Sequence, residues 1–241
     1  MTNLPQTTIL ITGASSGIGE ATASELAASG ARLFLGARRT ERLALLAQEL
    51  GENVAWHSLD VVDADSFDAF VAAAETRFGR IDALVNNAGV MPLAPLAALK
   101  RDEWKRMVDV NIHGVLNGIA AVLPRFSAQG GGHIINVASI AAHKVVPSAA
   151  VYCGTKHAVR AITEGLRLEH DNIRATLISP GVVATELGHD ISDPAVAEAL
   201  FEWRKQSLTP DAIARAVHFA LEQPAGVDVN EIIVRPTSAN M

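Results

Sequence analysis

The sequence predicts an α/β fold: a single doubly wound parallel β-sheet with helices on both faces. Three observations predict it. Short runs rich in β-branched residues alternate with helical stretches along the whole chain, as in a parallel sheet covered on both sides. A glycine-rich turn follows the first of these runs. The chain has 241 residues, 49% of them hydrophobic, which suffices for one large core. We therefore expect one domain spanning 1–241.

The alternation fixes the expected order of elements. Strands are expected at 8–12, 32–37, 54–58, 83–86, 133–137, 174–178 and 231–234. Helices are expected at 18–29, 40–50, 101–127, 150–169 and 211–221, and one more runs to about residue 78. Thr40 is the expected N-cap of the second helix, and Asp63 or Asp65 that of the third. The stretch 181–208 is irregular, and its length and position predict a mobile lid.

Composition and charge exclude several classes of protein. The net charge is −6 without a basic cluster, which argues against nucleic-acid or anionic-membrane partners. Residues 1–6 lack the features of a signal peptide, and no apolar run is expected to approach the ~20 residues that cross a bilayer. The single cysteine, Cys153, excludes an internal disulfide and indicates a cytoplasmic location. The eight histidines show no metal-binding pattern, so no metal is expected.

The turn after the first strand indicates a nucleotide site. It reads Gly13-Ala14-Ser15-Ser16-Gly17-Ile18-Gly19 and opens a helix. Glycines let backbone amides approach a pyrophosphate, which then lies at the positive end of the helix dipole. The spacing departs from GxGxxG, and small residues in such a turn can also serve only to pack helix against strand.

The end of the second strand indicates which dinucleotide is bound. A site that prefers NAD places a carboxylate about 20 residues after the glycines, whereas this chain has Arg38 and Arg39 there. Arginine binds a 2′-phosphate through paired hydrogen bonds, and a carboxylate would repel it. We therefore predict NADP(H), with Arg38 as the leading contact and Arg39 second. The alternative is a solvated loop.

Tyr152 and Lys156 are the candidate chemical groups. Side chains four residues apart on a helix share one face, about 6 Å apart along the axis, so the ammonium of Lys156, together with a bound cationic nicotinamide ring, is expected to lower the pKa of the Tyr152 phenol. Such a phenol is a proton donor near neutrality, and Ser139 would hold the substrate oxygen. An ordinary amphipathic pair is the alternative for Tyr152 and Lys156.

These motifs together resemble the short-chain dehydrogenase/reductase family over nearly the whole chain. The matching residues are Thr12 to Gly19, Asp60, Asn86-Asn87-Ala88-Gly89, Asn111, Ser139, Tyr152-x3-Lys156 and Pro180-Gly181. The resemblance implies a Rossmann-type sheet, a nicotinamide cofactor, and a catalytic tetrad of Asn111, Ser139, Tyr152 and Lys156. It implies that the tyrosine is the acid or base, the serine orients the carbonyl or alcohol, and the lysine also contacts the nicotinamide ribose. The asparagine would position a water beside the lysine.

The resemblance also implies the remaining cofactor contacts. Asp60 would accept a hydrogen bond from the adenine amino group, and Thr185 would contact the carboxamide or a phosphate. The other implied contacts are Gly13, Ser15, Ser16, Gly17, Ile18, Gly19, Val61, Asn87, Ala88, Gly89, Tyr152, Lys156, Pro180, Gly181 and Val183. The implied reaction is hydride transfer between a nicotinamide and a small-molecule carbonyl or alcohol, without a metal. A homodimer or homotetramer built through the helices near Asn111 and Tyr152 is also implied.

Several alternatives stay open at this point. Asn86 is expected to have a structural role; the alternative for Asp60 is a turn cap, and the alternative for Asn111 is a kink in its helix. Cys153 and His157 are spaced as a nucleophile and base, but no third group is recognisable. A protein that binds NADP(H) as a sensor or scaffold is the non-catalytic alternative. The predicted substrate pocket is apolar, which favours a neutral, medium-sized substrate; its expected residues are 91–93, 140–146, Leu187, Ile191, Phe201 and Trp203.

Overall fold

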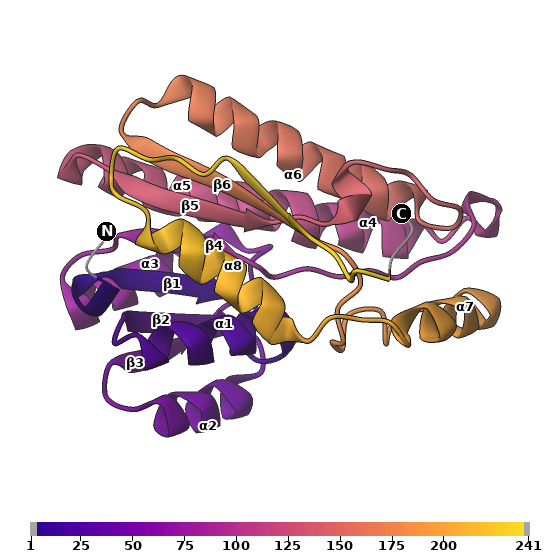
Figure 1. Ribbon diagram of the computed structural model, residues 1–241, viewed down its shortest axis with the longest axis horizontal. Coiled ribbons are helices and arrows are strands. Elements are labelled where there is room, and N and C mark those ends of the chain that lie inside the picture. The colour runs from indigo at the N-terminus through magenta and orange to yellow at the C-terminus, as the bar shows by residue number, and fades with distance from the viewer. Residues whose placement is uncertain (1–3, 239–241) are drawn as a thin grey trace.

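The computed structural model describes residues 4–238; residues 1–3 and 239–241 of the expected domain lie outside the described residues. A seven-stranded sheet forms the centre of the molecule (Figure 1), in the order β3-β2-β1-β4-β5-β6-β7. All neighbouring strands are parallel. The strands are β1 (Thr8–Thr12), β2 (Arg32–Ala37), β3 (Val54–Ser58), β4 (Ala83–Asn86), β5 (Gly132–Val137), β6 (Ile173–Pro180) and β7 (Glu231–Val234). The predicted doubly wound parallel sheet is confirmed.

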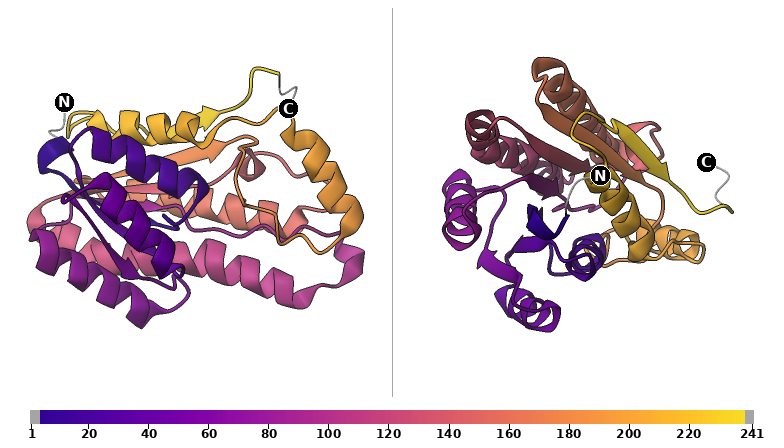
Figure 2. Two further views of the ribbon diagram at one scale, coloured as in Figure 1. Left: turned by 90° about the horizontal axis from the view of Figure 1, so that it is seen from below. Right: turned by 60° about the vertical axis from the view of Figure 1, so that its left-hand side comes forward.

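Helices cover both faces of the sheet (Figures 1 and 2), and alternate residues of each strand face opposite layers. Ile9 and Ile11 of β1 belong to the core on the side of α1, α2 and α8, whereas Leu10 belongs to the core under α3, α5 and α6. All three side chains are fully buried, as the two-residue period of a strand requires. The helices are α1 (Gly17–Ala28), α2 (Thr40–Leu50), α3 (Ala64–Phe78), α5 (Gly114–Gln129), α6 (Ala150–Glu169) and α8 (Pro210–Glu222). Short 3-10 turns are Leu4–Gln6, Leu96–Ala98 and Ile140–Ala142.

The expected long helix is present, but a π-helical turn interrupts it. It runs as α4 (Arg101–Val108), a π segment (Asp109–His113) and α5. The widened turn contains Asn111, and π turns inside α-helices are frequent at functional sites. The sequence pattern predicted the helix but not this change of hydrogen bonding.

The helical span Arg101–Gln129 is longer and more apolar than we expected of any segment of this chain. Within the described residues it is the one helix long and apolar enough, with a mean hydropathy of 1.3, to cross a membrane. It packs against α3 and strands β4 and β5, and Val122 and Phe126 are fully buried in that layer. Its apolar face therefore belongs to the core of this sheet.

Two local expectations need correction. The stretch 181–208 is not irregular throughout: helix α7 (Pro194–Arg204) forms within it, beyond the carboxyl ends of the strands (Figure 1). Asp193 is the N-cap of α7: its Oδ1 accepts hydrogen bonds from the amides of Ala195 and Val196, and Pro194 is the first residue of the helix. An aspartate followed by a proline is a capping signal that the sequence already shows. Thr40 is the first residue of α2 and Arg39 its N-cap, whereas Asp63 caps α3 as predicted.

Candidate functional site

The Ser139 hydroxyl and the Tyr152 phenol meet at the carboxyl end of the sheet. Ser139 follows β5 and caps the 3-10 turn Ile140–Ala142, where its Oγ accepts a hydrogen bond from the Ala141 amide at 3.1 Å. Tyr152 lies in the first turn of α6 and is 6% exposed. Ser139 is close enough to the phenol to act on its pKa, which it lowers. The structure therefore pairs the residues that the sequence proposed as substrate holder and proton donor.

The electrostatics of Tyr152 differ from our expectation. Burial raises the pKa of the phenol to about 12, and Ser139 only partly opposes this. Burial disfavours the phenolate because the charge leaves water. Among the groups of the protein itself, desolvation therefore has a larger effect on the Tyr152 pKa than any nearby cation, so Lys156 alone does not lower it, and the lowering by Lys156 together with a bound nicotinamide stays a prediction.

Lys156 is buried beside the tyrosine. Its Nζ lies 5.8 Å from the centroid of the Tyr152 ring and donates a hydrogen bond to the Val137 carbonyl at 2.9 Å. The side chain is 6% exposed, and burial lowers its pKa to about 8. Among residues 4–238 no carboxylate pairs with this ammonium, and a cation buried so deeply without one is uncommon for a structural lysine, which favours a functional role.

Asn111 joins three parts of the site through its side-chain amide. Oδ1 accepts from the Val90 amide at 2.9 Å, and Nδ2 donates to the Val90 carbonyl at 3.0 Å and to Thr155 Oγ1 at 3.1 Å. Thr155 in turn donates to the Tyr152 carbonyl at 2.7 Å. Asn111 therefore ties the π turn to the start of α6. Thr155 was missed by the sequence analysis, since a threonine inside a helix gives no signal by itself.

The glycine turn is packed so closely that side chains would not fit. A Cβ on Gly19 would lie 2.5 Å from the Gly13 carbonyl oxygen, and one on Gly13, whose φ is +67°, would lie 2.9 Å from Ala88 Cα. Asn87 fastens this turn, because its Nδ2 donates to the carbonyls of Thr12 and Gly13 at 3.0 and 3.3 Å. This is a structural clamp on the nucleotide loop.

The N-terminus of α1 meets the loop that follows β6. Ser16 is the N-cap of α1, although its side chain makes no capping hydrogen bond to the helix, and a Cβ on Gly17, at φ +58°, would lie 3.0 Å from Thr185 Cγ2. Gly181 donates its amide to the Val234 carbonyl, and Val183 is bridged to Leu208. Both segments, including Pro180 at the end of β6, lie at the carboxyl edge of the sheet, where open α/β sheets bind ligands.

Arg39, rather than Arg38, reaches the glycine turn. Its Nε donates to Ser15 Oγ at 3.0 Å and its Nη2 to Ser16 Oγ at 2.6 Å. Its Nη1 is 2.6 Å from Glu186 Oε2, and Arg42 Nη1 is 2.7 Å from Glu186 Oε1. Arg38 is exposed at the end of β2. The structure thus connects the second-ranked arginine to the loop that the sequence identified.

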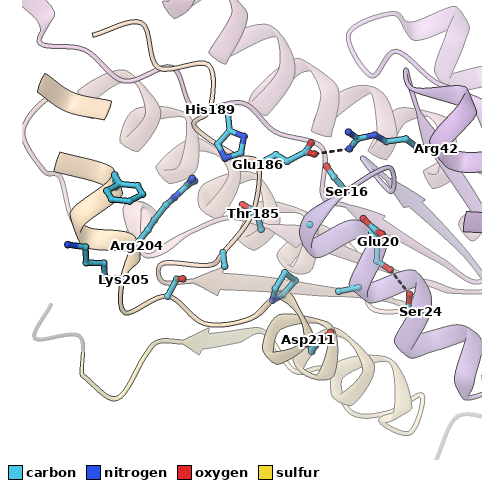
Figure 3. A pocket seen from close by; sticks show the side chains of 16 residues that line it. Ser16, Glu20, Ser24, Arg42, Thr185, Glu186, His189, Arg204, Lys205 and Asp211 are labelled. Carbon is cyan, nitrogen blue, oxygen red and sulfur yellow. Dashed lines mark hydrogen bonds and ion pairs between the residues drawn. The ribbon is translucent and has the colours of Figure 1, made fainter. Parts of the chain in front are cut away.

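A cavity of about 780 Å³ opens beside this arginine and glutamate cluster (Figure 3). It separates α1 from α7 and the loop after β6, and Figure 3 shows Glu186 extending to Arg42 across its upper rim. Ser16, Gly17 and Thr185 belong to its wall, so it borders the expected nucleotide site. Charged side chains from both sides also line it, together with His189: Glu20, Arg42, Glu186, Arg204, Lys205 and Asp211.

Asp60 and Val61 lie on the turn between β3 and α3. Asp60 Oδ1 accepts a hydrogen bond from the Val62 amide at 3.3 Å, so the turn-capping role is present. The Val61 carbonyl accepts from Asn117 Nδ2 at 2.9 Å. Asn86 is structural as expected: its Nδ2 donates to Asn136 Oδ1 at 2.9 Å inside the core.

The cysteine and histidine pair does not have the geometry of a nucleophile and base. Cys153 is fully buried, and His157 Nδ1 lies 2.9 Å from the Cys153 carbonyl rather than from its thiol. Among residues 4–238, no group of three or more His, Cys, Asp or Glu side chains is arranged to hold a metal ion.

Comparison with known proteins identifies the family. Residues 7–195 match the family model described as short chain dehydrogenase. The chain belongs to the short-chain dehydrogenase/reductase family. It is 51% identical, over the full length of both chains, to an uncharacterised oxidoreductase of Staphylococcus saprophyticus. This family is one of oxidoreductases that use a nicotinamide cofactor, so those two properties extend to this protein.

Two solved structures of family members share the fold but hold different dinucleotides. An alcohol dehydrogenase of the archaeon Thermococcus sibiricus, complexed with 5-hydroxy-NADP, is 34% identical, covers 98% of each chain and has a TM-score of 0.88. A short chain dehydrogenase/reductase of Burkholderia phymatum, in complex with NAD, is 26% identical, covers 97% of this chain and 90% of its own, and has a TM-score of 0.87. The choice between NAD and NADP therefore depends on local residues.

Proposed function

We propose that this protein is an NADP(H)-dependent oxidoreductase that interconverts a carbonyl compound and an alcohol, with Tyr152 as general acid and base. The observation that carries the proposal is the buried Tyr152 phenol, on whose pKa Ser139 acts, with the buried Lys156 ammonium 5.8 Å from the centroid of the phenol ring. Non-catalytic binding of a nucleotide does not require a buried lysine beside a buried tyrosine. The arrangement serves proton transfer.

The residues at the carboxyl edge of the sheet fit a dinucleotide. Gly13 and Gly19 let the turn pack closely against Asn87 and Ala88, where a Cβ would clash, and we propose that backbone amides at the start of α1 bind the pyrophosphate. Lys156 is the proposed contact for the nicotinamide ribose and Asp60 for the adenine. The further proposed contacts are Ser15, Ser16, Gly17, Ile18, Arg38, Arg39, Val61, Asn87, Ala88, Gly89, Tyr152, Pro180, Gly181, Val183 and Thr185.

The bound nicotinamide supplies or accepts the hydride, and the protein handles the proton. In reduction, the Ser139 hydroxyl donates a hydrogen bond to the substrate oxygen, and Tyr152 gives its phenolic proton to that oxygen as the carbon receives the hydride. Tyr152 is left as a phenolate, which the Lys156 ammonium stabilises. Asn111 positions this machinery through Val90 and Thr155. In alcohol oxidation the same proton moves in reverse.

The preference for NADP(H) is supported by charge at the end of β2. Arg38 and Arg39 stand where a site for NAD places a carboxylate, and Arg39 already lies against the glycine turn. We expect kcat/KM for NADPH to exceed that for NADH. A preference of the wild-type enzyme for NADH in the same hydride-transfer assay would refute this part of the proposal.

The decisive experiment replaces Tyr152 with Phe. The variant keeps the ring but removes the proton, so turnover should be lost while NADPH still binds with near wild-type affinity. Cys153→Ala is the matched control, since it alters the neighbouring buried residue and should leave turnover intact. Near-normal turnover of Tyr152→Phe would overturn the mechanism, and loss of turnover in Cys153→Ala with retained NADPH binding would revive the cysteine nucleophile.

The substrate we propose is a neutral, medium-sized carbonyl compound or alcohol. Met91 and Leu200 lie near Gly188, at 3.0 and 2.9 Å from where its Cβ would be, and Ile191 is 3.4 Å away. The stretch 181–208, which we propose as a lid, therefore presents apolar side chains toward the segment after β4. A substrate screen that favoured charged acids would contradict this class.

We also propose a cytoplasmic homodimer or homotetramer that binds neither nucleic acid nor membrane. The single, buried cysteine and the acidic net charge support this, and exposed apolar residues on the helices near the site, such as Leu116 at 42% and Leu168 at 68%, are compatible with subunit contacts. Light scattering that gives a monomer would refute the oligomer.

A further inference from the structure

One carboxylate already forms ion pairs with the two arginines beside the glycine turn. Glu186, in the loop after β6, bridges Arg39 at 2.6 Å and Arg42 at 2.7 Å. Its two oxygens contact different guanidinium groups, so a single side chain from the proposed lid binds both cations. The residues are more than 140 positions apart in the chain, and the contact joins the lid to the start of α2.

The surroundings show that Glu186 is the anion bound by this pair. The other nitrogens of Arg39 donate to neutral groups, the hydroxyls of Ser15 and Ser16. Glu20 also acts on Arg42 but more weakly than Glu186. Hydrogen bonds from Arg42 and then Arg39 hold the pKa of Glu186 at about 2, so the carboxylate stays charged at neutral pH. Two arginines and one glutamate leave a net positive charge for a more highly charged anion.

We propose that Glu186 is a specificity-determining residue that occupies Arg39 and Arg42 until the 2′-phosphate of NADP(H) displaces it. The inference rests on the proposed cofactor. A 2′-phosphate carries about 1.5 to 2 negative charges and three acceptor oxygens, so it binds paired guanidinium groups better than a single carboxylate does. The 2′-hydroxyl of NAD(H) has no charge and leaves Glu186 in place.

The displacement also acts on the lid. Glu186 is followed by Leu187, whose carbonyl accepts a hydrogen bond from Arg204 at the end of α7. Release of Glu186 therefore frees the segment that is joined to α7, while the far side of the lid stays bound through Arg106 and Asp190 at 2.9 Å. The ion pairs of Glu186 therefore make movement of this side of the lid depend on whether NADP(H) or NAD(H) binds.

The test compares Glu186→Gln with wild type, using 2′,5′-ADP and 5′-ADP as probes in isothermal titration calorimetry. The three side chains are 43%, 51% and 42% exposed, so each ion pair is screened by water and the effect is modest. Removing the internal competitor should tighten 2′,5′-ADP binding by about 3- to 10-fold and leave 5′-ADP binding unchanged. Unchanged or weaker binding of 2′,5′-ADP would overturn the inference.

Glu20→Gln is the matched control, because Glu20 lines the same cavity but forms no ion pair with either arginine. If it tightened 2′,5′-ADP as much as Glu186→Gln, the gain would come from net charge, and occupancy by Glu186 would be refuted. If wild type and Glu186→Gln both bound the two probes equally, the NADP(H) assignment itself would fail. A wild-type preference for 2′,5′-ADP that Glu186→Gln leaves unaltered would refute the inference alone.

Discussion

Replacing Lys156 with Met should make the stability of the protein respond differently to pH. Burial lowers the pKa of this ammonium from 10.5 to about 8. A tenfold change in proton affinity corresponds to about 1.4 kcal/mol, so holding the charged group in the fold costs about 3 kcal/mol at neutral pH. Methionine has a similar shape and no charge. It removes that cost but leaves the Val137 carbonyl without its donor, which costs about 1–3 kcal/mol.

The pH dependence separates these two contributions. Below about pH 8 the lysine is charged in both folded and unfolded chains, so its contribution is constant. Between about pH 8 and 10.5 the unfolded chain holds the proton and the folded chain loses it, so wild-type stability rises with pH. Relative to Lys156→Met, the wild-type free energy of unfolding should therefore rise by about 2 kcal/mol from about pH 7 to about pH 9.5. The free-energy cost of the Val137 carbonyl that has lost its donor in the variant is the same at every pH.

The assay is urea unfolding of both proteins at equal protomer concentration across this range. Lys144→Met is the control, since Lys144 is exposed, and this variant should follow wild type at each pH. A wild-type minus Lys156→Met difference that does not change with pH would show that the site does not lower the pKa of the lysine. The desolvation argument for the active-site electrostatics would then be wrong.

Further predictions concern catalysis, the nucleotide turn and the core. The kcat/KM for carbonyl reduction should fall as pH rises through about 8, because Lys156 then loses the charge that stabilises the phenolate; a flat pH-rate profile would contradict this. Gly19→Ala should weaken NADPH binding at least ~10-fold in a fluorescence titration, since its Cβ would lie 2.6 Å from Asn87 Nδ2 and the loop must shift. Gly154→Ala, in a helix with nothing within 4 Å of its Cβ, should instead raise the free energy of unfolding by about 0.5–1 kcal/mol. Asn136→Ala should lower it by roughly 2–4 kcal/mol, because two buried partners lose their hydrogen bonds; a loss below about 1 kcal/mol would show that the network is not needed.

The fold was predictable because its signals are local and repeated. The apolar runs from Thr8 to Thr12 and from Ala83 to Asn86 form strands within the predicted bounds, since a buried parallel strand needs a continuous apolar segment. Helix α7 was missed although Asp193 and Pro194 form a capping signal. The surrounding glycine and aspartate residues favoured a loop, and the helix depends on packing of Leu200, which is 9% exposed.

The candidate site was predictable in its residue types but not in its interactions. Spacing placed Tyr152 and Lys156 on one helix face, yet it could not show that both become buried. The sign of the tyrosine's pKa change depends on that burial. The position of Asn111 was predicted, whereas its bonds to Val90 and Thr155 depend on a π turn that has no sequence period of its own.

The arginines after β2 show why the cofactor question requires the three-dimensional contacts. Adjacent residues at a strand end point in different directions, so the sequence could not decide which arginine meets the glycine turn. The structure gives that contact to Arg39 and adds Glu186, which no local pattern connects to it. An anion site that already contains an internal carboxylate binds a phosphate less tightly than the unoccupied arginines would, because the phosphate must first displace the carboxylate. The preference for a 2′-phosphate is therefore created by the arginines and reduced by Glu186.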